Sequence, residues 1–331
     1  MAIKIGQIGT QHVHANGKAK ALIRDDAVDF VGVFEPNQEL LAKAKADAAW
    51  AGVTWLESAD DLLKDPNIRA VFVETHPLQN QFWVRQALTA GKHIHCDKAP
   101  GTSLAEFRNL VALAKERGLV LQQGYQFRYN KGLRFAVQAA KDGLLGRPFH
   151  MRARISVDLV DYERLRSEIE PCPGGMFYYL GSHMVDLMTS VFGRPIRVTP
   201  TLRADGDAHL PYVDNTIVVF EFPRATAVIE SATIEVKAFE HRRFEIYGTK
   251  GSVIVEPFEN PAPKVLMALD EERDGYKAGW QPVEVGNEAR YVEDIAELLA
   301  LIAGTRTPIV SSEHDIITHE TLLRACGVLG G

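Results

Sequence analysis

The sequence predicts an α/β protein of two domains. The first would hold a doubly wound parallel sheet, and the second would be an α+β domain with a large, mainly antiparallel open sheet. The length of 331 residues suits two domains. Short apolar strands alternate with helices up to residue 123, whereas strands joined by short turns dominate the remainder. We therefore expect domains over residues 1–123 and 124–331.

Composition and charge exclude several classes of protein. With 46% hydrophobic and 24% charged residues, the chain resembles a globular protein rather than a disordered chain, a collagen-like repeat or a coiled coil. The net charge of −6 argues against nucleic acid as a main partner, because phosphate binding needs clustered Lys and Arg. No apolar run approaches the roughly 18 residues of a membrane helix, and the first residues lack the apolar core of a signal peptide. We expect a cytoplasmic protein without membrane contact, whose three cysteines are reduced thiols.

The first domain is predicted from apolar runs and from helix signals between them. Continuous apolar runs are typical of parallel strands that are buried on both faces. Strands are expected over 3–8, 28–34, 70–73, 93–96 and 119–122, and helices over 17–24, 38–49, 78–90 and 103–117. Ligands of such sheets bind beyond the carboxyl ends of the strands. The residues that follow Ile8, Phe34, Val73 and Cys96 are therefore the first candidates for a site.

The second domain is predicted from a run of strands with helices on either side. Strands are expected over 149–157, 198–202, 215–222, 225–235, 242–247 and 252–256. Helices are expected over 132–142, 176–192, 289–303 and 313–328. The C-terminal helix could pack back on the first domain.

The turn after the first strand carries an incomplete nucleotide-binding signal. A dinucleotide fingerprint would read Gly-x-Gly-x-x-Gly there, but the chain reads Gly9-Thr10-Gln11-His12-Val13-His14. Backbone N–H groups at the start of the next helix could still hold a pyrophosphate. We therefore expect Gly9, Thr10, Gln11 and His12 to bind the cofactor.

Glu35, at the end of the second strand, bears on which dinucleotide is bound. A carboxylate there would accept a hydrogen bond from a ribose 2′-hydroxyl and repel a 2′-phosphate, which favours NAD over NADP. Alternatively, Glu35 only caps the turn before Pro36. His12 and His14 are spaced like a pair of metal ligands. No neighbouring Asp, Glu or Cys in the sequence completes a ligand set, so no metal is predicted.

Lys98 follows the fourth strand within Asp97-Lys98-Ala99-Pro100. An ammonium group at the ligand edge of the sheet could donate a hydrogen bond to a substrate hydroxyl and lower its pKa. The alternative is an exposed surface lysine.

The helix expected over 176–192 carries the strongest group of titratable residues. Apolar residues share one face at helical spacing, while Tyr179, His183, Asp186 and Ser190 share the other. His183 could act as a general base, with Tyr179 relaying a proton and Asp186 fixing the imidazole tautomer. A solvated helix face is the alternative. The preceding Gly174-Gly175 argues against it, because paired glycines let a backbone come close to another group.

Five motifs in order resemble the Gfo/Idh/MocA family, which includes glucose–fructose oxidoreductase and inositol dehydrogenase. The resemblance covers essentially the whole chain. The motifs are the Ile5–Ala15 nucleotide loop, Thr75-His76-Pro77, the Ala90–Lys98 segment, Tyr125-x-x-Arg128, and the helix that runs from Gly174-Gly175 through His183 to Asp186.

The resemblance implies a Rossmann domain and hydride transfer between a nicotinamide cofactor and a carbinol of a sugar or cyclitol. It places Lys98 near the cofactor and the reacting hydroxyl, makes His183 the acid/base, and adds Thr75 and His76 to the cofactor site. It also implies that Tyr125, Arg128 and Asp186 orient the substrate, and that the protein forms a homodimer or homotetramer through the open sheet.

One departure from the family is serious. The family aspartate four residues before the histidine is Tyr179 in this chain. Tyr179 could substitute for it in proton transfer, could recognise a different substrate, or could mark a chain that binds sugar and NAD without turnover.

Two classes of function follow. The first is an NAD-dependent sugar or polyol dehydrogenase in which Lys98, His183 and Tyr179 are catalytic, including a variant that oxidises transiently and recycles its NAD. The second is a non-catalytic NAD- and sugar-binding regulator. Retention of both Lys98 and His183 favours the enzyme, since a sensor needs no proton acceptor.

Overall fold

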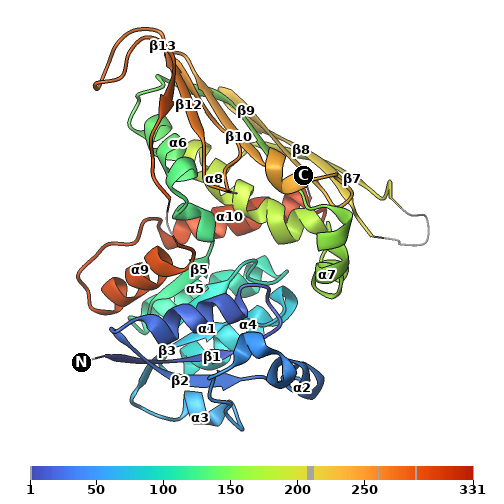
Figure 1. The fold of residues 1–331 in the computed structure, drawn as a ribbon, viewed down its shortest axis with the longest axis vertical. Coiled ribbons are helices and arrows are strands. Elements are labelled where there is room, and N and C mark those ends of the chain that lie inside the picture. Colours follow the sequence, from blue (N-terminus) through green and yellow to red (C-terminus); the bar gives the residue numbers. More distant parts are fainter. Residues whose placement is uncertain (1, 207–211, 260, 288, 331) are drawn as a thin grey trace. The chain divides into compact units, whose positions relative to one another are not determined.

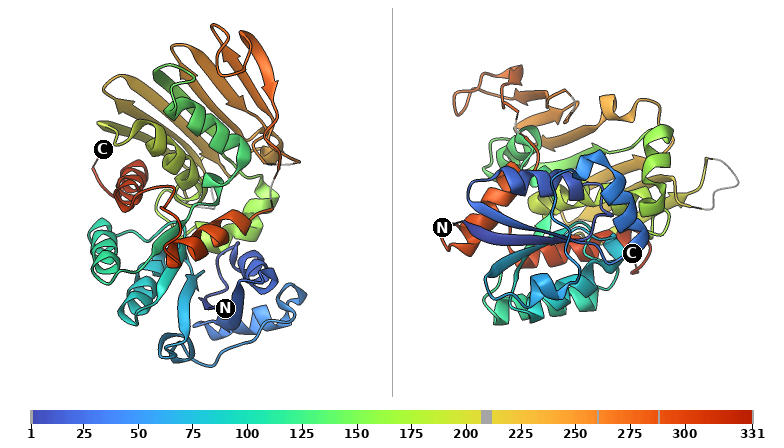
Figure 2. Two further views of the ribbon diagram at one scale, coloured as in Figure 1. Left: turned by 90° about the vertical axis from the view of Figure 1, so that its left-hand side faces the viewer. Right: turned by 60° about the horizontal axis from the view of Figure 1, so that its bottom comes forward.

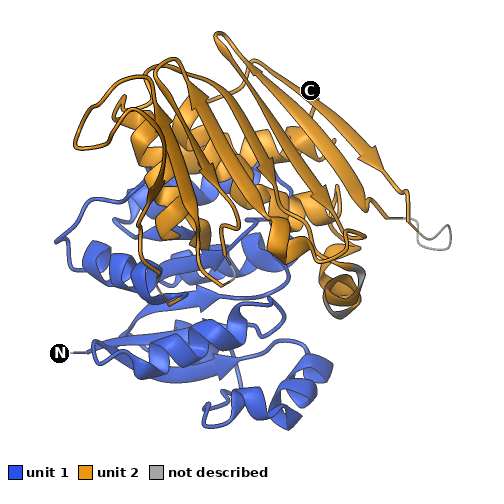
Figure 3. Cartoon of the chain, turned by 45° about the horizontal axis from the view of Figure 1, so that its top comes forward, with its two compact units in different colours: residues 1–124, 290–312 blue, residues 125–289, 313–331 orange. Residues whose placement is uncertain are grey.

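The computed structural model describes residues 2–206, 212–259, 261–287 and 289–330. The chain folds into two compact units (Figure 3). Unit 1 contains residues 1–124 and 290–312, and unit 2 contains residues 125–289 and 313–331. The segment 290–312 thus belongs to unit 1 although it follows the strands of unit 2 in the sequence.

Unit 1 is built on a five-stranded parallel sheet with the order β2-β1-β3-β4-β5 (Figure 1). This architecture confirms the predicted doubly wound parallel sheet. The strands are β1 (Ile3–Ile8), β2 (Val28–Phe34), β3 (Ile68–Val73), β4 (His93–Asp97) and β5 (Leu121–Gly124). The helices are α1 (Ala15–Arg24), α2 (Gln38–Ala46), α3 (Asp60–Leu63), α4 (Asn80–Thr89), α5 (Leu104–Glu116) and α9 (Val292–Ile302).

Apolar residues from both ends of the chain form the core of unit 1. On one side, Ile5 and Phe72 of the sheet pack with Leu22 of α1 and with Ile295 and Leu298 of α9. A larger cluster contains further residues of β1, β3, β4, α4 and α5. Burial on both sides explains why these strands read as continuous apolar runs in the sequence.

Unit 2 is built on an eight-stranded sheet with the order β13-β12-β11-β10-β6-β9-β8-β7. All neighbouring strands are antiparallel except β6 and β9, which confirms the mainly antiparallel second sheet. The strands are β6 (Pro148–Arg154), β7 (Arg197–Arg203), β8 (Asn215–Phe222), β9 (Ala225–Ala232), β10 (Arg243–Gly248), β11 (Gly251–Val255), β12 (Val265–Leu269) and β13 (Gly279–Val283). The helices are α6 (Lys131–Lys141), α7 (Leu159–Ile169), α8 (Ser182–Phe192) and α10 (Ser312–Ala325). Figure 2 shows α6 lying along one face of this sheet, where it packs on β10 and β11.

The helix predicted over 176–192 is interrupted. Phe177–Gly181 form a π-helical turn, η4, and α8 begins only at Ser182. Hydrogen bonds from i to i+5 add one residue to that turn. Residues before and after the turn therefore do not share the face that a regular spacing of 3.6 residues predicts. Within the described residues, no helix is both long and apolar enough to span a membrane.

Candidate active site

The turn after β1 has the backbone that a dinucleotide site needs. Gly9 has φ +94°, and a Cβ atom there would lie 2.7 Å from the backbone of Glu74 and Thr75. The strand order reverses between β1 and β3, which is where open α/β sheets bind ligands beyond the strand ends. The turn leads directly into α1, and the N-terminus of a helix favours a phosphate group. These residues fit a dinucleotide despite the two replaced glycines.

Glu35 fixes this turn from the end of β2. Its carboxylate accepts hydrogen bonds from the Thr10 backbone N (2.6 Å), from Thr10 Oγ1 (2.8 Å) and from the Asn37 backbone N (2.9 Å). Glu35 therefore does cap the turn before α2, and it also lies against the candidate nucleotide loop. A carboxylate has capacity for further hydrogen bonds, so these contacts leave a ribose role open.

A buried lysine of α1 forms the centre of a polar cluster that we name the Lys18 cluster (His12, His14, Lys18, Glu74, His95 and Asp97). Lys18 Nζ lies 2.6 Å from Asp97 Oδ2, 3.1 Å from Glu74 Oε1 and 2.5 Å from His95 Nε2. Asp97 Oδ2 also lies 2.9 Å from His14 Nδ1 and 3.3 Å from His12 Nδ1. The cluster gathers residues from α1 and from the carboxyl ends of β3 and β4.

Sequence reasoning missed Lys18, Glu74 and His95. A signal for Lys18 was present, because it occupies the same helical stripe as Ala15, Ala19 and Leu22, all of which are buried. A charge within an apolar stripe indicates a buried partner.

Burial and neighbouring charges shift the pKa values of the residues in the Lys18 cluster in different directions. Burial lowers the pKa of His14 to about 4 and that of His95 to about 3, so both imidazoles are neutral at pH 7. The two neighbouring carboxylates outweigh burial at Lys18 and raise its pKa. Burial raises the pKa of Glu74, whereas the surrounding histidines and Lys18 lower that of Asp97. Lys18 and Asp97 therefore form a buried ion pair, which Glu74 and the neutral imidazoles of His14 and His95 contact.

Lys98 follows this cluster directly. Its backbone N donates to Asp97 Oδ1 at 2.7 Å, and its side chain is buried, which rules out the exposed surface lysine. Asn80 of α4 donates to the backbone oxygens of Asp97 and Ala99 and accepts from Thr75 Oγ1 at 2.8 Å. The loops after β3 and β4 are thereby tied together beside Lys98. His76 Nδ1 accepts from the Leu78 backbone N and caps the short helix that follows.

In unit 2, His183 and Tyr179 are both buried, which excludes a solvated helix face. The His183 ring lies 4.5 Å from that of Phe127 and 5.8 Å from that of Tyr125, measured between centroids. The Tyr179 hydroxyl donates to Glu168 Oε2 at 2.5 Å. Glu168 comes from α7, a helix that we did not predict because its polar sequence has no continuous apolar stripe.

Arg128 connects three segments of unit 2. Its guanidinium donates to both oxygens of Asp186 on α8, at 2.9 and 2.7 Å, and to Asp315 on α10 at 2.5 Å. His314 Nε2 lies 2.8 Å from Asp186 Oδ1. The Arg128 charge outweighs burial and lowers the pKa of Asp186, while burial raises the pKa of Asp315. Asp186 is therefore a carboxylate held by Arg128 and His314, rather than the partner of His183 that we expected.

Other segments of unit 2 pack closely against the backbone of Gly174 and Gly175. A Cβ atom at Gly175, where φ is +53°, would lie 2.2 Å from the Val213 carbonyl oxygen, and one at Gly174 would lie 2.9 Å from Cys326 Sγ. The close approach that the pair predicts is therefore explained by packing within unit 2.

Two groups of side chains have the spacing of metal ligands: His12, His14 and Asp97 in unit 1, and Asp186, His314 and Asp315 in unit 2. The structure thus supplies the carboxylates that the sequence did not show beside the histidines. In each group, however, a protein cation already contacts the carboxylates, Lys18 in the first and Arg128 in the second. A bound metal would have to displace a buried, ion-paired side chain.

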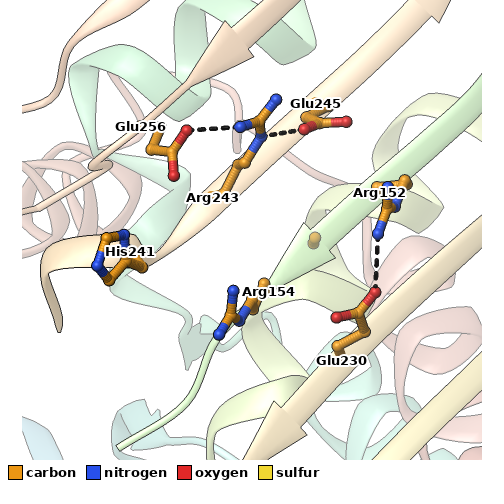
Figure 4. Close-up of a pocket in the computed structure, with 8 residues that line it drawn as sticks. Arg152, Arg154, Glu230, His241, Arg243, Glu245 and Glu256 are labelled. Carbon is orange, nitrogen blue, oxygen red and sulfur yellow. Dashed lines mark hydrogen bonds and ion pairs between the residues drawn. The ribbon is translucent and has the colours of Figure 1, made fainter. Parts of the chain in front are cut away.

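A pocket of about 290 Å³ lies on the sheet of unit 2 (Figure 4). Its polar lining residues are Arg152, Arg154, Glu230, His241, Arg243, Glu245 and Glu256. Figure 4 shows ion pairs from Arg152 to Glu230 and from Arg243 to Glu245 and Glu256. Arg154 is bound by Glu235. Because each arginine has a carboxylate, the pocket has no excess positive charge with which to bind an anion.

Comparisons with known proteins agree with this architecture. The family model for the oxidoreductase family with an NAD-binding Rossmann fold matches residues 3–125, and the model for the GFO/IDH/MocA C-terminal domain matches residues 133–254.

Individual relatives support the same assignment. The uncharacterized oxidoreductase YhhX of Escherichia coli (strain K12) is 28% identical over 72% of this chain and 64% of its own length. The chain thus spans less than two thirds of that relative. The myo-inositol 2-dehydrogenase of Thermotoga maritima is 23% identical over 94% of this chain and 90% of its own. The solved UDP-N-acetylglucosamine 3-dehydrogenase GnnA from Acidithiobacillus ferrooxidans superposes with a TM-score of 0.79 at 19% identity, covering 99% and 98% of the two chains.

Both halves of the chain match models of the same family, and the two sheets are of the kinds that the strand patterns predicted. The chain therefore belongs to the Gfo/Idh/MocA family of oxidoreductases with an NAD-binding Rossmann fold.

Proposed function

We propose that the protein is an NAD-dependent dehydrogenase that oxidises a carbinol of a sugar, sugar derivative or cyclitol. The observation that carries this proposal is the edge of the unit 1 sheet. There, Gly9, Glu35 and Thr10 form a turn suited to a dinucleotide, and the buried Lys98 follows the nearby strand β4. The myo-inositol 2-dehydrogenase among the relatives supports the substrate class.

Gly9, Thr10, Gln11, His12, Glu35, Thr75, His76 and Lys98 would hold the cofactor. When bound, a nicotinamide dinucleotide supplies the acceptor for a hydride. Lys98 would donate a hydrogen bond to the substrate hydroxyl and stabilise the developing negative charge on its oxygen. His183 would take the hydroxyl proton, and Tyr179 would assist in that transfer. Tyr125 would orient the substrate directly, and Arg128 and Asp186 would do so through their ion-pair network.

We propose NAD in preference to NADP because Glu35 places a carboxylate beside the Thr10 turn. We also propose a cytoplasmic homo-oligomer whose subunits meet through the open face of the unit 2 sheet. The arginines and glutamates of Figure 4 are already paired within the chain, so this part of the sheet would meet an identical surface without leaving an unpaired arginine.

The test is absorbance at 340 nm with NAD⁺ across inositols, aldoses, sugar acids and glycosides, with the Lys98→Met variant beside the wild type. We expect one class of carbinol to give NADH with the wild type, at a rate that falls by about 100-fold or more in the variant. Equal rates in both proteins would remove Lys98 from the mechanism. A wild type that forms no NADH would count against the proposed dehydrogenase.

A further inference from the structure

The Tyr179–Glu168 pair is the shortest phenol–carboxylate contact in unit 2 among the described residues. Tyr179 Oη and Glu168 Oε2 are 2.5 Å apart, and both side chains are buried, with exposed fractions of 1% and 8%. A hydroxyl donating to an ionised carboxylate gives distances of about 2.5–2.7 Å and is roughly twice as strong as a neutral hydrogen bond. Low local polarity strengthens such a bond further.

The bond determines what Tyr179 can offer to a ligand. A phenol has one proton, and here that proton is directed at Glu168. The lone pairs of the phenol oxygen can then only accept. Tyr179 in this state can receive a hydrogen bond from a ligand hydroxyl, but it cannot donate one to a ligand carbonyl.

The local backbone supports this arrangement. Tyr179, four residues before His183, lies in the π-helical turn η4. Such turns occur frequently at functional sites. Glu168 lies one residue before the end of α7, where its backbone oxygen accepts a weak hydrogen bond from Cys172 Sγ at 3.2 Å. The carboxylate thus reaches the acid/base segment from a different element.

We propose that Glu168 is a positioning residue of the acid/base group, which holds the Tyr179 phenol as a hydrogen-bond acceptor for a substrate hydroxyl and receives the phenol proton during the reaction. This inference rests on the proposed function and adds a residue to it.

The protein side chains in this step exchange protons only, and none of them is oxidised or reduced. His183 takes the hydroxyl proton of the substrate and passes it to the phenol oxygen, the O–H bond of Tyr179 breaks, and its own proton moves to Glu168 Oε2, so that His183 is neutral again. Tyr179 is again a neutral phenol, and Glu168 changes from a carboxylate to a carboxylic acid. The two electrons of the oxidation pass with the hydride to the NAD⁺ that the proposed function names.

The experiment is a double-mutant cycle with Glu168→Gln and Tyr179→Phe, assayed with NAD⁺ and the carbinol that forms NADH in the screen. We expect Glu168→Gln to lower kcat by at least about tenfold while KM stays within about twofold. The double variant should be no slower than Tyr179→Phe alone, because Glu168 acts through Tyr179. Tyr162 and Glu170 form a matched control, since Tyr162 also donates to a glutamate, at 3.1 Å, and Glu170 directly follows α7. Glu170→Gln should leave kcat unchanged.

Urea unfolding of the same four proteins gives a readout that needs no substrate. The midpoints should be non-additive, because both substitutions remove one bond. An unchanged kcat in Glu168→Gln, a change confined to KM, additive losses of kcat, or additive midpoints would each overturn the inference while the dehydrogenase stands. Failure of the wild type itself to form NADH would instead overturn the proposed function and this inference together.

Discussion

Glu35 illustrates how one side chain can serve both structure and specificity. It anchors the Thr10 turn, and in the function proposed above its carboxylate repels the 2′-phosphate of NADP. The sequence identified Glu35 from its position at the end of a strand. It could not show the bonds to Thr10, because those depend on how the two loops meet.

Glu35→Gln should relax the preference between the two cofactors. The amide keeps an oxygen that can accept from Thr10, but it removes the negative charge that repels a 2′-phosphate. We expect kcat/KM with NADP⁺, relative to NAD⁺, to rise by about tenfold or more, which corresponds to about 1.4 kcal/mol. The exposed Glu39→Gln, on α2, serves as the control. An unchanged ratio in Glu35→Gln would show that Glu35 only stabilises the turn.

Lys18→Met should destabilise the protein strongly. The substitution removes the ammonium group that lies 2.6 Å from Asp97 Oδ2 and 3.1 Å from Glu74 Oε1. Leaving a buried charge without its partner costs about 3–5 kcal/mol. The double variant Lys18→Met/Asp97→Asn should recover part of that loss. Lys64→Met, which removes an exposed ion pair with Asp60, should leave the urea midpoint unchanged. Equal midpoints for wild type and Lys18→Met would contradict the ion pair.

At the scale of elements, the sequence predicted those helices and strands in which apolar residues follow a regular pattern. The five strands of unit 1 and the antiparallel strands from β7 to β11 follow from apolar runs and short turns. The sequence missed β12 and β13, which are strands of only five residues at one end of the sheet, and β13 has no buried residue. It also missed α7 and the π-helical turn, because neither a polar helix nor a change of helical phase leaves a periodic signal.

A substitution at Gly175, just before η4, tests whether this turn depends on close backbone packing. Gly175→Ala combines a positive φ with a Cβ atom 2.2 Å from the Val213 oxygen, whereas Gly143→Ala has a positive φ and open space around it. Left-handed backbone alone costs an L-residue about 1–2 kcal/mol. We therefore expect Gly143→Ala to lose about that much free energy of unfolding and Gly175→Ala to lose more. Equal losses would mean that the backbone near Val213 yields without cost.

At the scale of the whole molecule, buried histidines set the response to acid. Burial lowers the pKa of His14 to about 4 and that of His95 and His319 to about 3, against about 6.5 in an unfolded chain. These residues stay neutral in the folded protein but bind a proton on unfolding. Their contribution is complete above pH 6.5 and is lost as the pH falls toward the folded values. Asp294, whose pKa burial raises to about 6, acts in the opposite direction, since its contribution is lost as the pH rises through 6.

The histidines whose pKa is lowered outnumber the carboxyl groups whose pKa is raised, which predicts a net loss of stability in acid. The histidines are His12, His14, His93, His95 and His319, and the carboxyl groups are Glu74, Asp294 and Asp315. Each histidine adds about 1.4 kcal/mol per pH unit to that loss below pH 6. The urea midpoint should therefore fall steadily between pH 6.5 and pH 4.5. His319→Gln should make the fall shallower by about one proton. A midpoint that is flat over this range would show that the histidines are not buried in solution.

The return of residues 290–312 to unit 1 affects how this protein can be divided. A fragment that ends at residue 124 would contain all five strands of the first sheet but would lack α9. Leu22 and Phe72 would then lose Ile295 and Leu298 and would face water. The cofactor-binding half is therefore not a module that can be cut out, or exchanged with that of a relative, at a single point in the gene. A working exchange would have to carry the distant α9 segment with it.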